Sequence, residues 1–226
     1  MPTFDAVAGL SSSGVGPFVW AHTCTGSNLV LVVNISIYDS ADTVTAVTYN
    51  GVAMSSRGSV SNGQYTVYQY ILVAPATGSN NVSVSVSGNV FDFGGTSISL
   101  TDTDQSTPAG TTVTASGTST TPSVTATSAA DEIVVDGLII VHNGTLTVGA
   151  DQTERRNTIA GSGFVKYAAS TAVGSTPTMD WSNSSSQAWA IIATPFKPVS
   201  AVSGQPLVKR LAGVPYMNTS FSPRIW

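Results

Sequence analysis

The side chains that could perform chemistry are few and scattered. His22 and Cys24 are two positions apart, so on a strand they would share a face and could begin a metal site. Zinc needs three or four ligands, and no second His/Cys pair occurs at ligand spacing, so we interpret them as a small core thiol beside a polar rim residue. His142 precedes Asn143-Gly144, a turn signal, which predicts an exposed turn histidine.

Carboxylates and serines suggest other chemistry. Serine is abundant, but no G-x-S-x-G elbow on a strand-turn-helix is present to predict a nucleophile. Asp102 and Asp104 in a turn, or Asp131-Glu132 before a strand, could hold Ca²⁺, although paired carboxylates in turns more commonly cap the turn. We predict no catalytic residue, no metal, no cofactor and no enzyme activity, with weak Ca²⁺ binding at Asp102 and Asp104 left open.

Aromatic and charged clusters are the remaining candidates for binding. Six aromatic residues could form a sugar-binding platform if they shared one outer face, namely Trp20, Trp181, Trp189, Tyr65, Tyr68 and Tyr70. On a strand, Tyr68 and Tyr70 share a face with Leu72, which favours packing. The only dense charge cluster, at 151–156, reads as a salt-bridged loop.

A β-hairpin anchors the elements that must position these residues. In Thr43 to Met54 (TVTAVTYNGVAM), Asn50-Gly51 lies between alternating runs and is a preferred pair for a type I′ turn. We expect Gly51 to have positive φ. We also expect one face of the hairpin to supply the core residues Val47, Tyr49, Val52 and Met54.

The rest of the chain up to residue 198 reads as further strands. Phe18 to Ser40 predicts one long strand, with Asn34 and Ser36 opposite an apolar face. Gly110 to Ser128 predicts exposed edge strands and a loop, and Asp136-Gly137 predicts a bulge or a sharp twist within the strand Ile133–Val141. Other strands are expected at Gln64–Val73, 82–87, Thr96–Leu100, Thr145–Val148, Gly163–Ala169, Thr178–Trp181 and Gln187–Phe196. Residues 1–198 therefore predict an all-β, antiparallel two-sheet β-sandwich of the jelly-roll or immunoglobulin-like kind.

Composition restricts the class of protein. Only 9% of the 226 residues are charged, so the surface must consist largely of Ser, Thr, Asn and Gly. The net charge of -4 argues against nucleic-acid binding, and the apolar runs are too short to span a membrane. The single Cys24 excludes an internal disulfide, and the N-terminus shows no secretory signal, which would fit release by cell lysis as in a virus particle.

The composition changes at residue 199. All twelve acidic residues precede it, whereas 199–226 is basic and contains prolines that block regular structure. We therefore predict an extended C-terminal arm over 199–226. Its expected partner-binding residues are Lys209, Arg210, Leu211, Tyr216, Phe221, Arg224 and Trp226.

Several motifs carry a family resemblance. TVTAVTYNGVAM, YILVAPATGSNNVSVSVSG, TDTDQSTP, TSTTPSVTATSAADEIVVDGL, ADQTER and SSSQAWAIIATPFKP resemble a β-sandwich domain that recurs in bacteriophage structural proteins and some bacterial surface proteins. The resemblance covers roughly residues 4 to 198, and LVKRLAGVPYMNTSFSPRIW is similar to short tails that end phage virion proteins.

This resemblance implies a virion structural protein. We expect a capsid decoration (cement) protein on the outer capsid surface, which binds the major capsid protein, forms a homo-oligomer, and contacts neither nucleic acid nor membrane. The alternative is a tail-fibre or surface carbohydrate-binding module. Exposed aromatic residues on a sandwich face would favour that alternative.

Overall fold

The computed structural model describes residues 1–39, 41–141 and 144–200, and in these ranges the chain is built from β-strands without a helix. The strands are β1 (Thr3–Val15), β2 (Phe18–Cys24), β3 (Val30–Tyr38), β4 (Val44–Tyr49), β5 (Val52–Ala53), β6 (Ser55–Asn62), β7 (Tyr65–Val73), β8 (Gly78–Val86), β9 (Asn89–Thr101), β10 (Val113–Ser119), β11 (Ser123–Thr125), β12 (Ile133–Val141), β13 (Leu146–Val148), β14 (Thr153–Ile159), β15 (Val165–Val173), β16 (Thr178–Asn183) and β17 (Gln187–Phe196). Among the described residues, no helix is long and apolar enough to cross a membrane.

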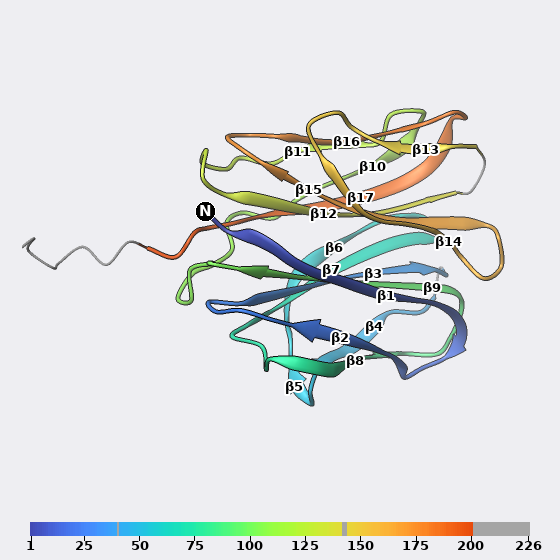
Figure 1. Cartoon of the computed structure of the whole chain (residues 1–226). Helices are drawn as coiled ribbons and strands as arrows, with labels where there is room; N and C mark the ends of the chain where they lie inside the picture. The colour runs from blue at the N-terminus through green and yellow to red at the C-terminus, as the bar shows by residue number, and fades with distance from the viewer. Residues whose placement is uncertain (40, 142–143, 201–226) are drawn as a thin grey trace, which may run out of the picture.

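The strands form four antiparallel sheets stacked as layers (Figure 1). Outer sheet 1 (β2-β8-β4-β5) packs on inner sheet 1 (β1-β9-β3-β7-β6) to form sandwich 1. Inner sheet 2 (β10-β17-β12-β15-β14) packs on outer sheet 2 (β11-β16-β13) to form sandwich 2. The predicted all-β fold of antiparallel sheets packed as sandwiches is confirmed, although the sequence analysis expected one pair of sheets and the structure has two.

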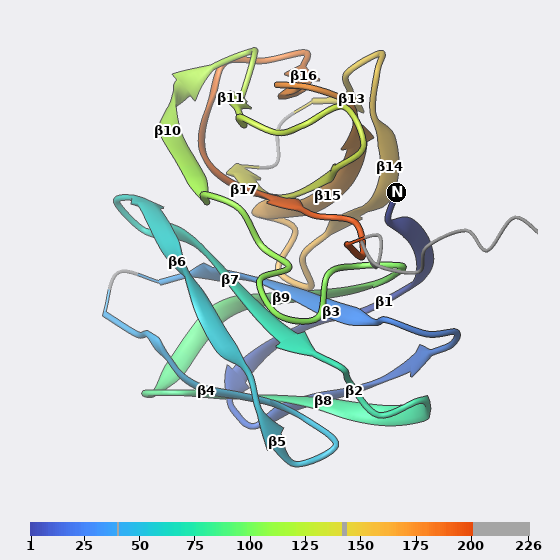
Figure 2. The same ribbon diagram turned by 90° about the vertical axis from the view of Figure 1, so that its left-hand side faces the viewer.

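The two sandwiches repeat one topology. Each inner sheet places its first strand at one edge, followed by its last strand, and the remaining strands β3-β7-β6 correspond to β12-β15-β14. Figure 2 shows the two sandwiches one above the other in an end view. Both sheets have a bulge at the same place, between Ser56 and Gly58 on β6 and between Glu154 and Arg156 on β14. The chain therefore contains two consecutive β-sandwiches of the same topology.

The two inner sheets face each other, which buries β3 on both sides. Asn34 and Ser36, which the alternation placed opposite the apolar face, are 4% and 3% exposed. Asn34 Nδ2 donates to the Asp136 carbonyl (2.7 Å), Gln69 Nε2 donates to Asn34 Oδ1 (2.9 Å), and the Thr194 hydroxyl donates to Gln69 Oε1. Buried polar groups with partners do not incur the cost of unpaired burial, so this network lets a polar face serve as an interface between the sandwiches.

Several strand predictions need correction. The single strand expected from Phe18 onward is two strands, with β2 in outer sheet 1 and β3 in inner sheet 1, separated by a turn at Gly26 and Asn28 with positive φ. The edge strands β1 and β6 were not predicted, because their sequences are too small and polar to show apolar alternation. Edge strands were correctly expected in 110–128, where β10 and β11 each end a sheet.

The hairpin is present as β4 and β5. Asn50 and Gly51 have φ of 49° and 76°, as a type I′ turn requires. Val47, Tyr49 and Met54 are buried as predicted, but Val52 is 54% exposed. Because β5 is a two-residue edge strand, its side chains extend beyond the partner sheet and Val52 has nothing to pack against.

We expect Gly51→Val to lower the free energy of unfolding by about 1–2 kcal/mol, since a β-branched residue is strained at positive φ. A Cβ there meets nothing within 4 Å, so the cost comes from the backbone alone. Thermal denaturation of this variant beside Gly51→Asn, which tolerates positive φ, tests the turn. Equal melting temperatures for the two variants would contradict it.

Candidate functional site

His22 lies within a chain of buried hydrogen bonds that links outer sheet 1 to inner sheet 1. Trp20 Nε1 donates to Ser97 Oγ (2.9 Å), which lies 2.9 Å from His22 Nδ1. His22 Nε2 lies 3.0 Å from Ser99 Oγ, and Ser99 Oγ donates to the Asp5 carboxylate (2.6 Å). Since Ser99 gives its proton to Asp5, its oxygen accepts a hydrogen bond from His22 Nε2.

This cluster contains Ser, His and Asp but does not have the geometry of a catalytic triad. In a triad the carboxylate orients the histidine and the serine faces the substrate. Here Asp5 contacts Ser99 instead, and His22 is 1% exposed. Burial lowers the pKa of His22 to about 4, with Asp5 opposing the shift. His22 is therefore a core residue that fastens two sheets, which corrects its expected place at the rim.

Cys24 is fully buried in the core of sandwich 1, as predicted. Burial raises the pKa of its thiol, which disfavours the reactive thiolate.

Asp136 is a buried titratable group of sandwich 2, and its segment is regular rather than bulged. The pairing of β12 with β17 runs through Asp136 and Gly137 without a shift. A Cβ on Gly137 would overlap the Asn34 side chain, so the glycine is explained by packing between the sandwiches. The Asp136 carboxylate accepts from the Ser170 N–H and from Trp181 Nε1 (2.8 Å), and burial raises its pKa to about 7.

Two of the four candidate calcium residues, Asp104 and Glu132, cap turns. Asp104 Oδ1 accepts from the N–H groups of Thr107 (2.7 Å) and Ser106 (2.8 Å), and these hydrogen bonds lower the pKa of Asp104. Glu132 accepts from the Ala129 N–H (3.2 Å). Within the described ranges, no group of three or more His, Cys, Asp or Glu residues could hold a metal ion. His142 lies outside the described residues.

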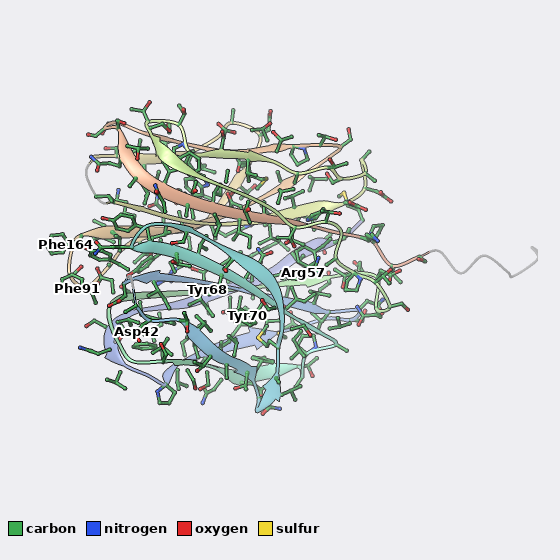
Figure 3. The ribbon with its side chains drawn as sticks, turned by 180° about the vertical axis from the view of Figure 1, so that it is seen from behind. Asp42, Arg57, Tyr68, Tyr70, Phe91 and Phe164 are labelled. Carbon is green, nitrogen blue, oxygen red and sulfur yellow. The ribbon has the colours of Figure 1, made fainter. Side chains whose placement is uncertain are left out.

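Most of the aromatic residues considered for a sugar platform serve packing. Trp20, Trp181 and Trp189 are buried in the sandwich cores. Tyr68 and Tyr70 lie on β7 and pack against the core of sandwich 1, as their shared face with Leu72 predicted (Figure 3).

The two aromatic residues with the most exposed side chains were not selected by the sequence analysis, but Tyr65, which was selected, lies in the same cluster. Phe91 and Phe164 are 52% and 56% exposed, and Tyr38 and Tyr65 lie beside them. Phe91 belongs to the same strand as the buried Phe93, so local alternation carries no signal of its exposure. Phe91 is uncovered because it lies near the end of the sheet, and the sequence does not show where the sheet ends.

The charge cluster at 151–156 belongs mostly to a strand, so the prediction of a salt-bridged loop is wrong. Thr153–Ile159 forms β14, the edge of inner sheet 2. Arg155 Nε donates to Thr171 Oγ1 (2.8 Å), and its guanidinium lies 3.7 Å from the centroid of the Phe4 ring. Arg155 thereby joins β1 of sandwich 1 to sandwich 2.

The predicted partner-binding residues of the arm lie outside the described residues: Lys209, Arg210, Leu211, Tyr216, Phe221, Arg224 and Trp226. The described structure shows where the arm begins. The Val199 N–H donates to the Asp102 carbonyl (2.8 Å) and Ser200 Oγ donates to Asp104 Oδ2 (2.9 Å). Val199 and Ser200 line a shallow depression together with Met1, so the arm begins at the end of the stack that also holds the N-terminus. Phe91 and Phe164 lie at the opposite end (Figure 3).

Comparison of the chain with protein-family models, with curated proteins and with solved structures found no match. The antiparallel β architecture that the family resemblance implied is present. The bacteriophage role that the family resemblance also implies remains a proposal.

Proposed function

We propose that the protein is a structural component of a bacteriophage particle, acting as a capsid decoration protein that attaches through its C-terminal arm. The sequence motifs, the uncharged polar surface and the basic arm motivate the proposal. The body would lie on the outer capsid surface, with the major capsid protein as its partner and further copies of the chain as neighbours.

The observation that carries the proposal is the way in which the arm joins the body. The arm follows β17, which pairs with β10 on one side and with β12 on the other. Antiparallel hydrogen bonds lie perpendicular to the strands, so a pull along β17 loads the bonds of both ladders together instead of one at a time. The body is thus well suited to hold a partner against outward pressure from packaged DNA.

Charge also separates the arm from the body. Twelve acidic and five basic residues give residues 1–200 a formal charge of −7, whereas Lys209, Arg210 and Arg224 give 201–226 a charge of +3. A basic segment with aromatic residues has the Arg and Trp anchors that commonly dominate the energy of an interface. We expect Arg210 and Trp226 to be the most sensitive single positions.

Truncation after Ser200 tests the attachment and retains the hydrogen bonds of Val199 and Ser200. We expect the truncated protein to be soluble, with an unchanged melting temperature, and to lose binding to shells that lack the protein, measured by co-sedimentation. Arg210→Ala and Trp226→Ala should each weaken attachment at least about tenfold, and Asn218→Ala is the matched control within the arm.

Full occupancy of shells by the truncated protein would show that the arm is not the anchor. Attachment would then come from a face or edge of the sandwiches. The number of copies per particle separates a decoration protein, present in hundreds, from a tail component, present in a handful.

A further inference from the structure

Four aromatic side chains gather at the end of the molecule that lies opposite the start of the arm. The Tyr38 and Tyr65 rings stack with their centroids 5.1 Å apart, and Phe91 meets Tyr38 edge-on at 5.2 Å. Phe164 lies 5.6 Å from Phe91 and 6.5 Å from Tyr38. We call these four residues the aromatic end, and Figure 3 shows its two phenylalanines side by side at the edge of the stack.

Both sandwiches build the aromatic end, and a buried carboxylate holds it together. Phe91 lies on β9 of sandwich 1, whereas Phe164 lies in the β14–β15 loop of sandwich 2. The fully buried Asp92 accepts from the N–H (3.2 Å) and the hydroxyl of Ser162 in that loop, and Ser162 Oγ accepts from the Phe164 N–H (3.2 Å). This contact fixes Phe164 beside Phe91 with more than half of each ring exposed.

The size of the exposed aromatic surface indicates what could cover it. A phenylalanine side chain can bury roughly 150–250 Å². Phe91 and Phe164, each about half exposed, therefore offer on the order of 200 Å². A stable protein partner covers about 800 Å² per side, so this surface is small for a second copy and suits one or two sugar rings.

The surroundings of the aromatic end fit a neutral, hydroxyl-rich ligand. Gln64, next to Tyr65, and Asn89, two residues before Phe91 on β9, are both exposed. Amides both donate and accept hydrogen bonds, as sugar hydroxyls do. An aromatic face can therefore stack on the C–H face of a pyranose, while the flanking amides hydrogen-bond to the hydroxyl groups at its rim.

We propose that the aromatic end binds a neutral oligosaccharide, with a pyranose packed on the exposed face of Phe91 or of Phe164, whose ring planes are inclined at 65° to each other. This sugar-binding proposal goes beyond the proposed attachment to the capsid. It relies on that attachment only to decide which end of the molecule faces outward. If the arm holds the particle, the aromatic end faces outward, where it meets glycans on cell surfaces.

The test uses the full-length protein and three probes: cellotetraose, laminaritetraose and lactose. Saturation-transfer NMR should show transfer to pyranose C–H protons and saturable binding of at least one probe. Phe91→Ala combined with Phe164→Ala should weaken this binding at least about tenfold. The double variant loses stacking on two rings, and a tenfold change in affinity corresponds to only about 1.4 kcal/mol of binding free energy. Phe91→Trp should strengthen binding, an outcome that a purely structural role would not produce.

Val52→Ala is the matched control, because Val52 is equally exposed at the β4–β5 hairpin in outer sheet 1. The double variant removes side chains that are more than half exposed, so its melting temperature should stay close to that of the wild type, and Phe164→Ala alone serves as the milder substitution. Attachment to shells should be unaffected by either change, which keeps this test independent of the arm.

Three results would overturn the assignment. The first is absence of saturable binding to all three probes, or equal binding by the double variant. The second is dimerisation that the double variant abolishes, which would assign the aromatic end to a second copy. The third is specific binding of a peptide with the sequence of residues 201–226, which would assign it to the arm of a neighbouring molecule.

Discussion

Gly94→Ala should lower the free energy of unfolding by about 3 kcal/mol, because overpacking a well-filled interior forces side chains or backbone to move. A Cβ on Gly94 would overlap the root of the Tyr167 ring, which crosses from inner sheet 2 onto β9. Tyr167 is 2% exposed, so its ring has no free space to enter. For a chain of this size we expect the melting temperature to fall by about 6–12 °C.

Gly161→Ala is the matched control, since a Cβ there meets nothing within 4 Å and its φ lies outside the left-handed range. Its melting temperature should not change. The double variant Gly94→Ala with Tyr167→Ala should be less destabilised than the sum of the single changes, because the added methyl occupies space left by the ring. Strict additivity would show that Gly94 and Tyr167 do not determine the spacing of the sandwiches.

Asp136→Asn should remove a pH-dependent contribution to stability that exists in the wild type. The pKa of Asp136 is raised to about 7 in the folded state, first by burial and further by Asp180, while the N–H donors of Trp181 and Ser170 oppose the shift. Between its ordinary pKa near 4 and about pH 7, the folded state binds this proton and the unfolded state does not. The Asp136 contribution is therefore most favourable near pH 4 and is lost as the pH rises through 7.

The measurement compares melting temperatures of wild type and Asp136→Asn from pH 5 to pH 8. From pH 5 to pH 7 we expect the advantage of the wild type to shrink by about 3 kcal/mol, the value for two pH units, on top of a pH-independent cost for the amide facing an N–H donor. The exposed Asp131→Asn is the control and should follow the wild type. Parallel curves for wild type and Asp136→Asn would contradict the assignment.

His22 contributes in the opposite direction. Its pKa is lowered to about 4, so its contribution is present above pH 6.5 and is lost as the pH falls toward 4. The two buried groups thus oppose each other between pH 4 and 6.5. Comparison of variants, not the wild-type curve alone, isolates the effect of Asp136.

The sequence alone determined the local structure. Apolar or alternating runs located β7, β8, β12 and β17, and the Asn50-Gly51 pair predicted the hairpin turn. The change in composition after residue 198 predicted the arm, most of which lies outside the described residues. These features depend on residues close together in the chain, so periodicity and turn chemistry suffice to identify them.

Only the tertiary structure decided which faces are covered. Alternation assigns Asn34 to the face of β3 opposite the apolar residues, but a second sandwich covers that face and buries Asn34 in a hydrogen-bonded interface. The same long-range packing placed Asp136 and His22 in the interior and left Phe91 and Phe164 exposed together. Burial depends on pairings between strands that are far apart in the sequence, and a strand's own period of two carries no record of what lies beyond either of its faces.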